Sequence, residues 1–234
     1  MKVYVAVDIE GIAGVTLKDE IQPSHPFFAE MRRQMTAECA AACRGALVAG
    51  ARKIVVKDGH GWGRTLDPRG LPREVRLMRG WRNEPMSVAQ LEGLDASFDA
   101  VLLVGMHAGG GSGGNPIAHT FSSTGLDTYC INGRAVCEAV FNMYAAELVG
   151  VPVVLVTGDE GVCAEVRKFA PAVATVAVKR GVGDSTDSLH PEVAAERIEA
   201  EAKKALRGDL SACRIRMPKR FVIDVRYKQA QWAY

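Results

Sequence analysis

The sequence contains no apolar run of membrane-spanning length. Apolar stretches such as residues 101–104 and 151–156 are the size of a strand, whereas a membrane helix needs about 18 uncharged apolar residues. The apolar N-terminal segment meets an acid, Asp8, after five residues, which is too short for the core of a signal peptide. We therefore expect a soluble protein of the cytoplasm.

The sequence also lacks a large excess of either basic or acidic residues. The 29 basic and 27 acidic side chains leave a net charge of only +2, so no strong field attracts nucleic acid or anionic lipid. With 48% hydrophobic and 24% charged residues, the composition excludes a disordered or fibrous chain. No linker divides the 234 residues, so we expect one domain over residues 1–234.

The cysteines lack the spacing of a disulfide framework. Cys39 and Cys43 are four apart on an expected helix, but no second cysteine or histidine pair accompanies them to complete a metal site. Cys163 is a poor nucleophile because its acidic neighbours raise the pKa of a thiol. We expect buried free thiols at all six positions, Cys39, Cys43, Cys130, Cys137, Cys163 and Cys213.

Short β-branched runs alternate with segments of helical periodicity. The expected strands are residues 2–8, 53–58, 100–105, 128–132, 152–157 and 175–178, and the expected helices are residues 27–49, 135–149 and 191–206. This alternation predicts an α/β fold with three αβα layers and a mostly parallel sheet. In such folds ligands bind at the carboxyl ends of the strands.

Two acids follow the first expected strand. Because side chains alternate along an extended chain, Asp8 and Glu10 point to the same side. Their like charges repel, and a bound cation removes that conflict. The pair therefore indicates a divalent metal site, although a solvated turn would show the same pattern.

Two histidines follow the next two strands. His60 ends the segment Asp58-Gly59-His60, and His107 ends Gly105-Met106-His107, so both imidazoles reach the edge where the acids lie. Imidazole together with carboxylate favours zinc or another first-row transition metal, whereas calcium and magnesium prefer oxygen ligands only. Two acids followed by two histidines are typical of a two-metal hydrolase.

Two further residues carry two interpretations each. Glu138 begins an expected helix, where it either faces the sheet edge or complements the helix dipole. His119 follows a glycine-rich loop and is either an acid/base group or a hydrogen-bonded loop histidine. The loop itself, residues 109–114, lacks the lysine and hydroxyl residues of a phosphate-binding loop; we expect a mobile loop over the active site.

Taken together, these segments resemble the DppA-type D-aminopeptidases, a family of zinc peptidases. The resemblance rests on six ordered motifs that span nearly the whole chain. They are Val7-Asp8-Ile9-Glu10-Gly11-Ile12, Asp58-Gly59-His60, Gly105-Met106-His107-Ala108, Ala118-His119-Thr120, Ile131-Asn132-Gly133-Arg134 leading to Glu138, and Val154-Leu155-Val156-Thr157-Gly158-Asp159.

The resemblance implies two zinc ions bridged by Asp8. Glu10 and His60 would complete the ligands of one ion, His107 and Glu138 those of the other, and His119 would be catalytic. It also implies hydrolysis of short peptides with N-terminal D-amino acids, and a ring-like homo-oligomer with a decamer as candidate stoichiometry. Family chains usually continue beyond the region of Trp232, so a C-terminal portion is expected to be missing.

The expected reaction is metal-assisted amide hydrolysis, in which a metal pair activates water and polarises the carbonyl. We predict that His119 donates a proton to the leaving amine; oxyanion stabilisation and a nucleophilic role stay open. Asp58 either orients an imidazole or forms a turn. Two alternative functions also remain, an inactive metal-binding peptide receptor and a dinuclear phosphoesterase.

Overall fold

The core of the protein is a seven-stranded sheet. The computed structural model describes residues 1–81 and 89–233. The strands, in spatial order, are β3 (Val75–Met78), β2 (Lys53–Asp58), β1 (Lys2–Val7), β4 (Ala100–Met106), β7 (Val153–Asp159), β8 (Ala174–Val182) and β9 (Ser185–Ser188). All neighbours pair in parallel except β9, which returns antiparallel along β8. Strands β4 and β7 are buried throughout, as expected for the centre of a sheet covered on both faces.

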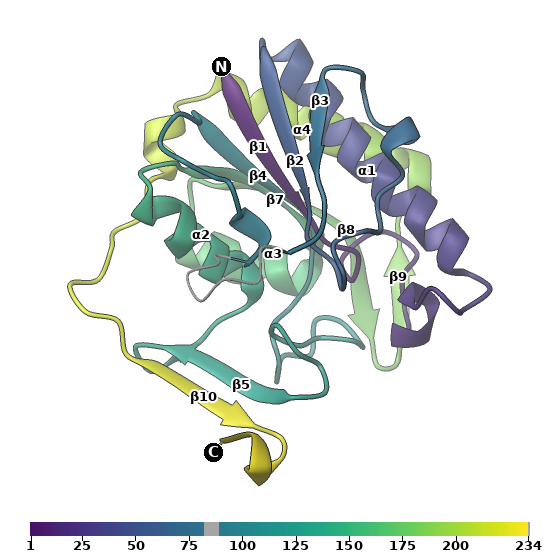
Figure 1. The fold of residues 1–234 in the computed structure, drawn as a ribbon, viewed down its shortest axis with the longest axis vertical. Helices are drawn as coiled ribbons and strands as arrows, with labels where there is room; N and C mark the ends of the chain where they lie inside the picture. Colours follow the sequence, from purple (N-terminus) through teal and green to yellow (C-terminus); the bar gives the residue numbers. More distant parts are fainter. Residues whose placement is uncertain (82–88, 234) are drawn as a thin grey trace.

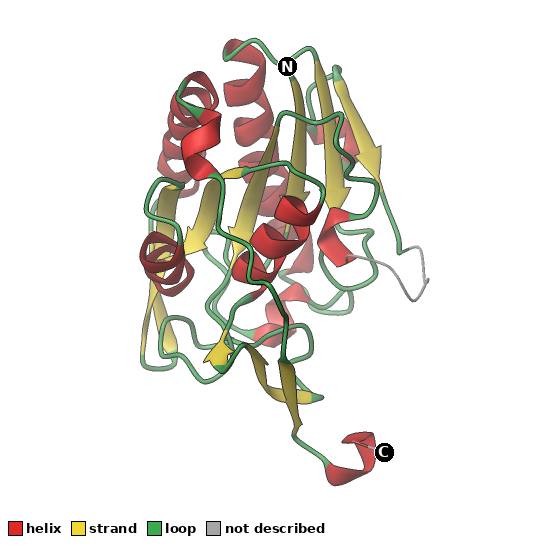
Figure 2. Cartoon of the chain, turned by 90° about the vertical axis from the view of Figure 1, so that its left-hand side faces the viewer, coloured by secondary structure: helices red, strands yellow, loops and turns green. Residues whose placement is uncertain are grey.

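Helices cover both faces of this sheet (Figure 1). They are α1 (Phe28–Val48), α2 (Glu138–Leu148), α3 (Glu160–Phe169) and α4 (Pro191–Arg207). Helices α1 and α4 pack on each other along one face, and α2 and α3 lie on the other. The view turned by 90° shows the same layering (Figure 2). The predicted three-layer α/β fold is therefore confirmed. No helix in the described ranges is long and apolar enough to cross a membrane.

The order of the strands reverses between β1 and β4. From β1 the chain crosses by α1 to β2 on one side, whereas β4, β7 and β8 follow one another on the other side. Right-handed crossovers in opposite directions place their helices on opposite faces of the sheet. A crevice opens at such a switch point, outside the carboxyl ends of the two strands. Asp8 and His107 directly follow those two ends.

The predicted strand at residues 128–132 lies outside the main sheet. As β5 (Leu126–Ile131) it pairs antiparallel with β6 (Arg134–Ala135) and with β10 (Ile223–Tyr227). Asn132 and Gly133 have φ values of 51° and 77°, the signature of a two-residue hairpin turn. Strand β6, which follows this turn, occupies residue 135, where the helix was expected to begin, and α2 begins only at Glu138.

Several short elements were not predicted. In the described residues these are helix α3, strands β3, β6, β9 and β10, and five 3-10 helices (Lys18–Ile21, Pro68–Gly70, Ala89–Leu91, Leu210–Cys213 and Ala230–Ala233). Helix α3 begins directly at the end of β7, where Asp159 caps it by accepting a hydrogen bond from the Val162 amide. The segment at residues 154–159, which indicated strand β7, thus also contains the N-cap residue of α3. Within the described residues all six cysteines are free, and five are buried.

The turn after β1 touches the end of β4 without space for a side chain. The Gly11 amide donates to the Gly105 carbonyl at 2.9 Å, and the Asp8 amide donates to the Val104 carbonyl at 2.8 Å. A Cβ atom on Gly11 would lie 1.7 Å from the Met106 carbonyl oxygen. Gly105 has φ of 70°, and its Cβ would lie 2.2 Å from the Asp8 carbonyl oxygen. Glycine at both positions therefore permits the two strand ends to meet.

We expect Gly11→Ala to lower the free energy of unfolding by about 3 kcal/mol, because the methyl group must displace backbone atoms. Gly113→Ala is the control, since its Cβ would meet no atom within 4 Å, and it should change stability by less than about 0.5 kcal/mol. Urea denaturation of the metal-free proteins measures both. Equal stability of the two variants would contradict the close approach.

Candidate metal centre

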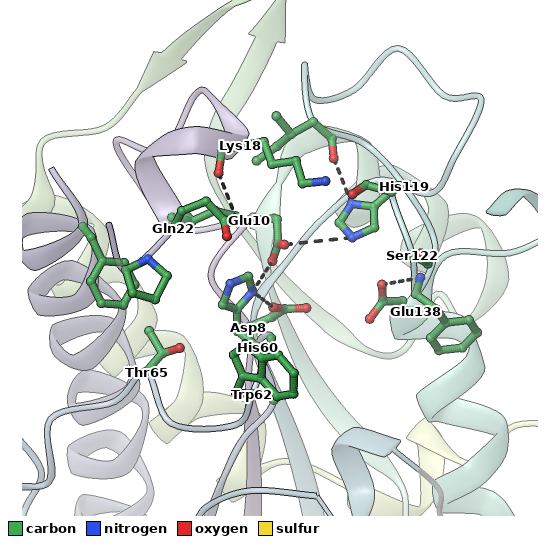
Figure 3. Close-up of a pocket in the computed structure, with 18 of the residues that line it drawn as sticks. Asp8, Glu10, Lys18, Gln22, His60, Trp62, Thr65, His119, Ser122 and Glu138 are labelled. Atoms are coloured by element: carbon green, nitrogen blue, oxygen red, sulfur yellow. Dashed lines mark hydrogen bonds and ion pairs between the residues drawn. The ribbon is translucent and has the colours of Figure 1, made fainter. Parts of the chain in front are cut away.

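A cavity of about 910 Å³ opens at the carboxyl edge of the sheet. Its lining includes Asp8, Glu10, His60, His119 and Glu138 (Figure 3). His107 lies directly behind them and is fully buried. The structure thus brings together all six side chains that the sequence indicated, from segments more than 100 residues apart.

The first group consists of Asp8, Glu10 and His60. The Nδ1 atom of His60 lies 3.2 Å from Glu10 Oε2 and 3.5 Å from Asp8 Oδ1. Both carboxylates face His60, as the sequence predicted, but they do so from the turn that follows β1 and not by alternation along a strand. One atom from each of the three side chains lies within 4.8 Å of the others, the arrangement that a metal ion needs.

The second group consists of His107, Glu138 and His119. The Nε2 atom of His107 lies 3.5 Å from Glu138 Oε1, and the imidazole rings of His107 and His119 stack with centroids 4.3 Å apart. Glu138 is the first residue of α2 and is only 6% exposed. Burial against His107 decides between its two interpretations, because a carboxylate that only complements a helix dipole would face water.

Asp8 lies between the two groups. Its Oδ1 atom faces His60 at 3.5 Å, and its Oδ2 atom faces His107 Nε2 at 3.8 Å. A carboxylate with one oxygen directed to each group has the geometry to span two metal ions about 3.5–4 Å apart.

In the absence of metal, shared protons hold these charges together. Burial and the neighbouring Glu10 carboxylate raise the pKa of Asp8 to about 8. Burial acts to lower the pKa of His107, but its contact with Glu138 outweighs this and raises the pKa to about 10. The pKa of His60 is likewise raised against the effect of burial, by Glu10 and Asp8. A divalent cation would replace these protons as the compensating charge.

The orientation of His107 fits a metal ligand. Its Nδ1 atom lies 3.0 Å from the Ala108 carbonyl, and since a carbonyl only accepts, Nδ1 carries the hydrogen. In the neutral ring that a metal would bind, the lone pair is therefore on Nε2, which is buried and faces the carboxylates without a hydrogen-bond partner of normal geometry. An imidazole held by a carbonyl through one nitrogen and free at the other is the usual arrangement of a metal-binding histidine.

His119 has the same tautomer in a different environment. Its Nδ1 atom donates to the Ile117 carbonyl at 3.0 Å, and its Nε2 atom lies 3.9 Å from Glu10 Oε1 (Figure 3). Burial and the neighbouring His107 lower the pKa of His119, which favours the neutral ring. A neutral imidazole with its basic nitrogen directed into the cavity is able to accept a proton.

Glu138 is held by two donors that the sequence did not indicate. The amide of Phe121, a residue with φ of 60°, donates to Glu138 Oε1 at 2.7 Å. The Nε2 atom of Gln90 donates to Glu138 Oε2 at 3.2 Å and to Asp8 Oδ2 at 2.8 Å. Asn142 on α2 fixes the orientation of this amide by donating to Gln90 Oε1 at 2.5 Å. Gln90 therefore connects the two groups of ligands.

Behind the metal centre, Asp159 joins the loops that carry its ligands. Its Oδ2 atom accepts hydrogen bonds from the Ala108 amide at 2.8 Å and from Asn115 Nδ2 at 2.9 Å. Asn115 also donates to the Glu10 carbonyl at 3.1 Å, and Lys179 donates to the same oxygen at 2.6 Å. The loops that carry Glu10, His107 and His119 are thus fixed relative to one another.

The structure also tests the expectations for Asp58 and for the glycine-rich loop at residues 109–114. Asp58 forms a turn: it accepts a hydrogen bond from the Leu66 amide at 2.7 Å and bonds to no imidazole within the described residues. Residues 109–114 contribute nothing to the cavity lining, so the expectation that this loop covers the active site is wrong. The loop instead packs beside α3 and β8, where Gly114 accepts a hydrogen bond from Gly181.

We expect Gln90→Leu to weaken zinc binding about tenfold, because two ligands lose the donor that orients them. Gln34→Leu is a matched control, since Gln34 is a buried glutamine that donates to Glu38 and to none of the expected ligands. Competition with a chelating indicator measures both affinities. Wild-type affinity in Gln90→Leu would show that this amide does not support the site.

Comparisons with known proteins agree with this geometry. A family model described as D-aminopeptidase matches residues 1–234. A D-aminopeptidase from Bacillus subtilis (strain 168) is 30% identical over 237 residues, covering 100% of this chain and 85% of that protein. A solved structure, the Zn-dependent D-aminopeptidase DppA from Bacillus subtilis, a self-compartmentalizing protease, matches with a TM-score of 0.90 at 27% identity, over 100% of this chain and 85% of the other. The resemblance noted in the sequence is confirmed, and the chain belongs to the D-aminopeptidase family.

Proposed function

We propose that this protein is a zinc-dependent aminopeptidase that removes the N-terminal residue of short peptides, with D-amino-acid peptides as its substrates. The observation that carries the proposal is the pair of ligand groups that share Asp8 inside one open cavity. The substrate class follows the names of the relatives, a D-aminopeptidase and a Zn-dependent D-aminopeptidase. The phosphoesterase and the inactive receptor are not favoured, since both named relatives are peptidases.

In the proposed site two zinc ions are held by the chain's own residues. Glu10 and His60 would hold one ion, His107 and Glu138 would hold the other, and Asp8 would be shared between them. Three carboxylates and two imidazoles match the ligand preference of zinc, and the buried, unpartnered Nε2 atom of His107 supports the fit. When bound, zinc supplies Lewis acidity, which polarises a carbonyl and lowers the pKa of water.

His119 is the proton-transfer residue of this proposal. Its neutral ring presents Nε2 to the cavity, so it first accepts a proton from the attacking water. It then donates that proton to the nitrogen of the leaving amine, which completes hydrolysis without net change at the histidine. The general acid predicted from the sequence is thus the second half of a base-then-acid cycle, because the lowered pKa of His119 favours the neutral ring at the start.

The proposed assembly is a homo-oligomer, supported by the solved relative that is described as self-compartmentalizing. A decameric ring and a cytoplasmic location stay predictions from the sequence.

We expect His119→Ala to retain zinc and to lower kcat for D-Ala-D-Ala by about 100-fold or more, the usual contribution of a positioned acid/base. Metal analysis and initial rates on the same preparation separate the two effects. Loss of one zinc ion would identify His119 as a ligand instead, since it lies within ligand distance of His107 and Glu138. Retained zinc with unchanged turnover would remove its catalytic role.

We expect Asp8→Asn to weaken the binding of both zinc ions, because the amide retains only one oxygen with which to bind a metal. Glu10→Gln is the comparison, because it should weaken the binding of one ion and leave the binding of the other unchanged. Stoichiometry from metal analysis after dialysis against a series of zinc buffers measures the difference. Two tightly bound ions in Asp8→Asn would contradict the shared carboxylate.

A further inference from the structure

Three arginines form one wall of the metal-containing cavity. Arg32, Arg64 and Arg79 all line it, and we call them the arginine wall. Arg32 comes from α1, Arg64 follows β2, and Arg79 follows β3, so three separate segments supply positive charge to one place. Aspartates and glutamates also line this cavity, but those in the described lining, Asp8, Glu10 and Glu138, all belong to the metal centre.

Backbone carbonyls hold the wall together. Arg32 Nε donates to the Thr65 carbonyl at 2.6 Å and its Nη2 donates to the Leu66 carbonyl at 3.4 Å. Arg79 Nη2 donates to the Arg64 carbonyl at 3.0 Å. The segment that receives these bonds is itself fixed, because the Leu66 amide donates to the buried Asp58 carboxylate. Arg32 is therefore half-buried in a fixed orientation.

No ion pair within the described residues neutralises the wall, although the charge of Arg79 acts on the buried Asp58 carboxylate. No carboxylate in the described residues lies within ion-pair distance of the three guanidinium groups. The field of Asp67 reaches Arg32, but the oxygens of Asp67 are bound by Arg69 at 2.9 and 3.1 Å. Arg32 and Arg79 are held by backbone carbonyls, and the exposed Arg64 side chain adjoins them. Arginine groups without an ion-paired partner are well suited to bind a carboxylate from outside the protein.

The wall and the reacting centre lie on different sides of the cavity. In Figure 3, Thr65 marks the side of the wall, His119 and Glu138 lie on the opposite side, and His60 lies between them. The volume of about 910 Å³ is that of a pocket for a ligand the size of a short peptide. A peptide whose first peptide bond is at the metal centre would therefore direct its other end to the wall.

We propose that the arginine wall binds the free C-terminal carboxylate of the substrate, which makes the protein selective for short peptides with an unblocked C-terminus. This inference rests on the proposed aminopeptidase activity and adds to it the end of the peptide that is not cleaved. Replacing the carboxylate by a neutral amide removes its charge-assisted hydrogen bonds, which corresponds to about a tenfold to hundredfold loss in kcat/KM.

The test compares D-Ala-D-Ala with its C-terminal amide, by release of the N-terminal residue from zinc-loaded protein. We expect the wild-type protein to prefer the free acid at least about tenfold. Arg32→Gln and Arg64→Gln should each lower kcat/KM for the free acid by more than for the amide, and so reduce this preference. Arg76→Gln is the control, because Arg76 is an exposed arginine on β3 that does not line the cavity. Zinc content and thermal unfolding verify that each variant is intact.

The outcomes separate this proposal from the proposed function. Equal cleavage of acid and amide by the wild-type protein would overturn the role of the wall and leave the peptidase intact. Equal loss on both substrates in the arginine variants would overturn it as well. If neither peptide is cleaved, calorimetric titration of the same peptides decides: tighter binding of the acid that is lost in Arg32→Gln supports the wall, and equal or absent binding refutes it.

Discussion

The structure depends on one close approach between two stretches of backbone. The turn from Asp8 to Gly11 lies directly on the end of β4, with hydrogen bonds from Gly11 to Gly105 and no space for a Cβ atom on either glycine. This contact is at the point where the order of the strands reverses, so it opens the crevice and brings Asp8 and His107 together within it. A side chain between the two strand ends would separate the ligands of the two groups. The metal centre is thus a consequence of how β1 and β4 end.

A second requirement is that polar groups hold the buried charges in place. Three carboxylates share a small volume with three imidazoles, and each carboxylate has a partner from a distant segment: Gln90 for Asp8 and Glu138, and His60 for Glu10. Asp159 then fixes the loops themselves. Because the ligands are oriented by hydrogen bonds that are already present without metal, little rearrangement is needed for binding, which is the arrangement expected of an efficient catalytic site.

Much of the site was predictable from the sequence because its ligands follow strands. The parallel sheet brings His60 and His107 to the edge where Asp8 and Glu10 follow β1, although these two acids converge through a turn and not through the strand alternation on which the prediction relied. Gln90 and Asn142 were not predictable, since an isolated glutamine and an asparagine inside a helix carry no motif, and only tertiary packing brings them together. The Asn132-Gly133 pair is a local signal for a hairpin turn, although the pattern around it predicts a strand that leads to a helix. The second sheet that this hairpin forms could not be predicted locally, because it includes β10 from the far end of the chain. Glu138 needed the structure, because its position at a helix start is equally typical of a solvent-exposed acid.

The burial of three carboxylates in one place also links the stability of the fold to the supply of metal. Without cations these carboxylates depend on shared protons and on the neighbouring imidazoles, and the unfolded chain has no preformed site to bind an ion. An ion that binds only the folded chain stabilises it by about 2.7 kcal/mol at a free concentration 100 times its dissociation constant. The metal concentration therefore affects the stability of the fold as well as the activity of each molecule.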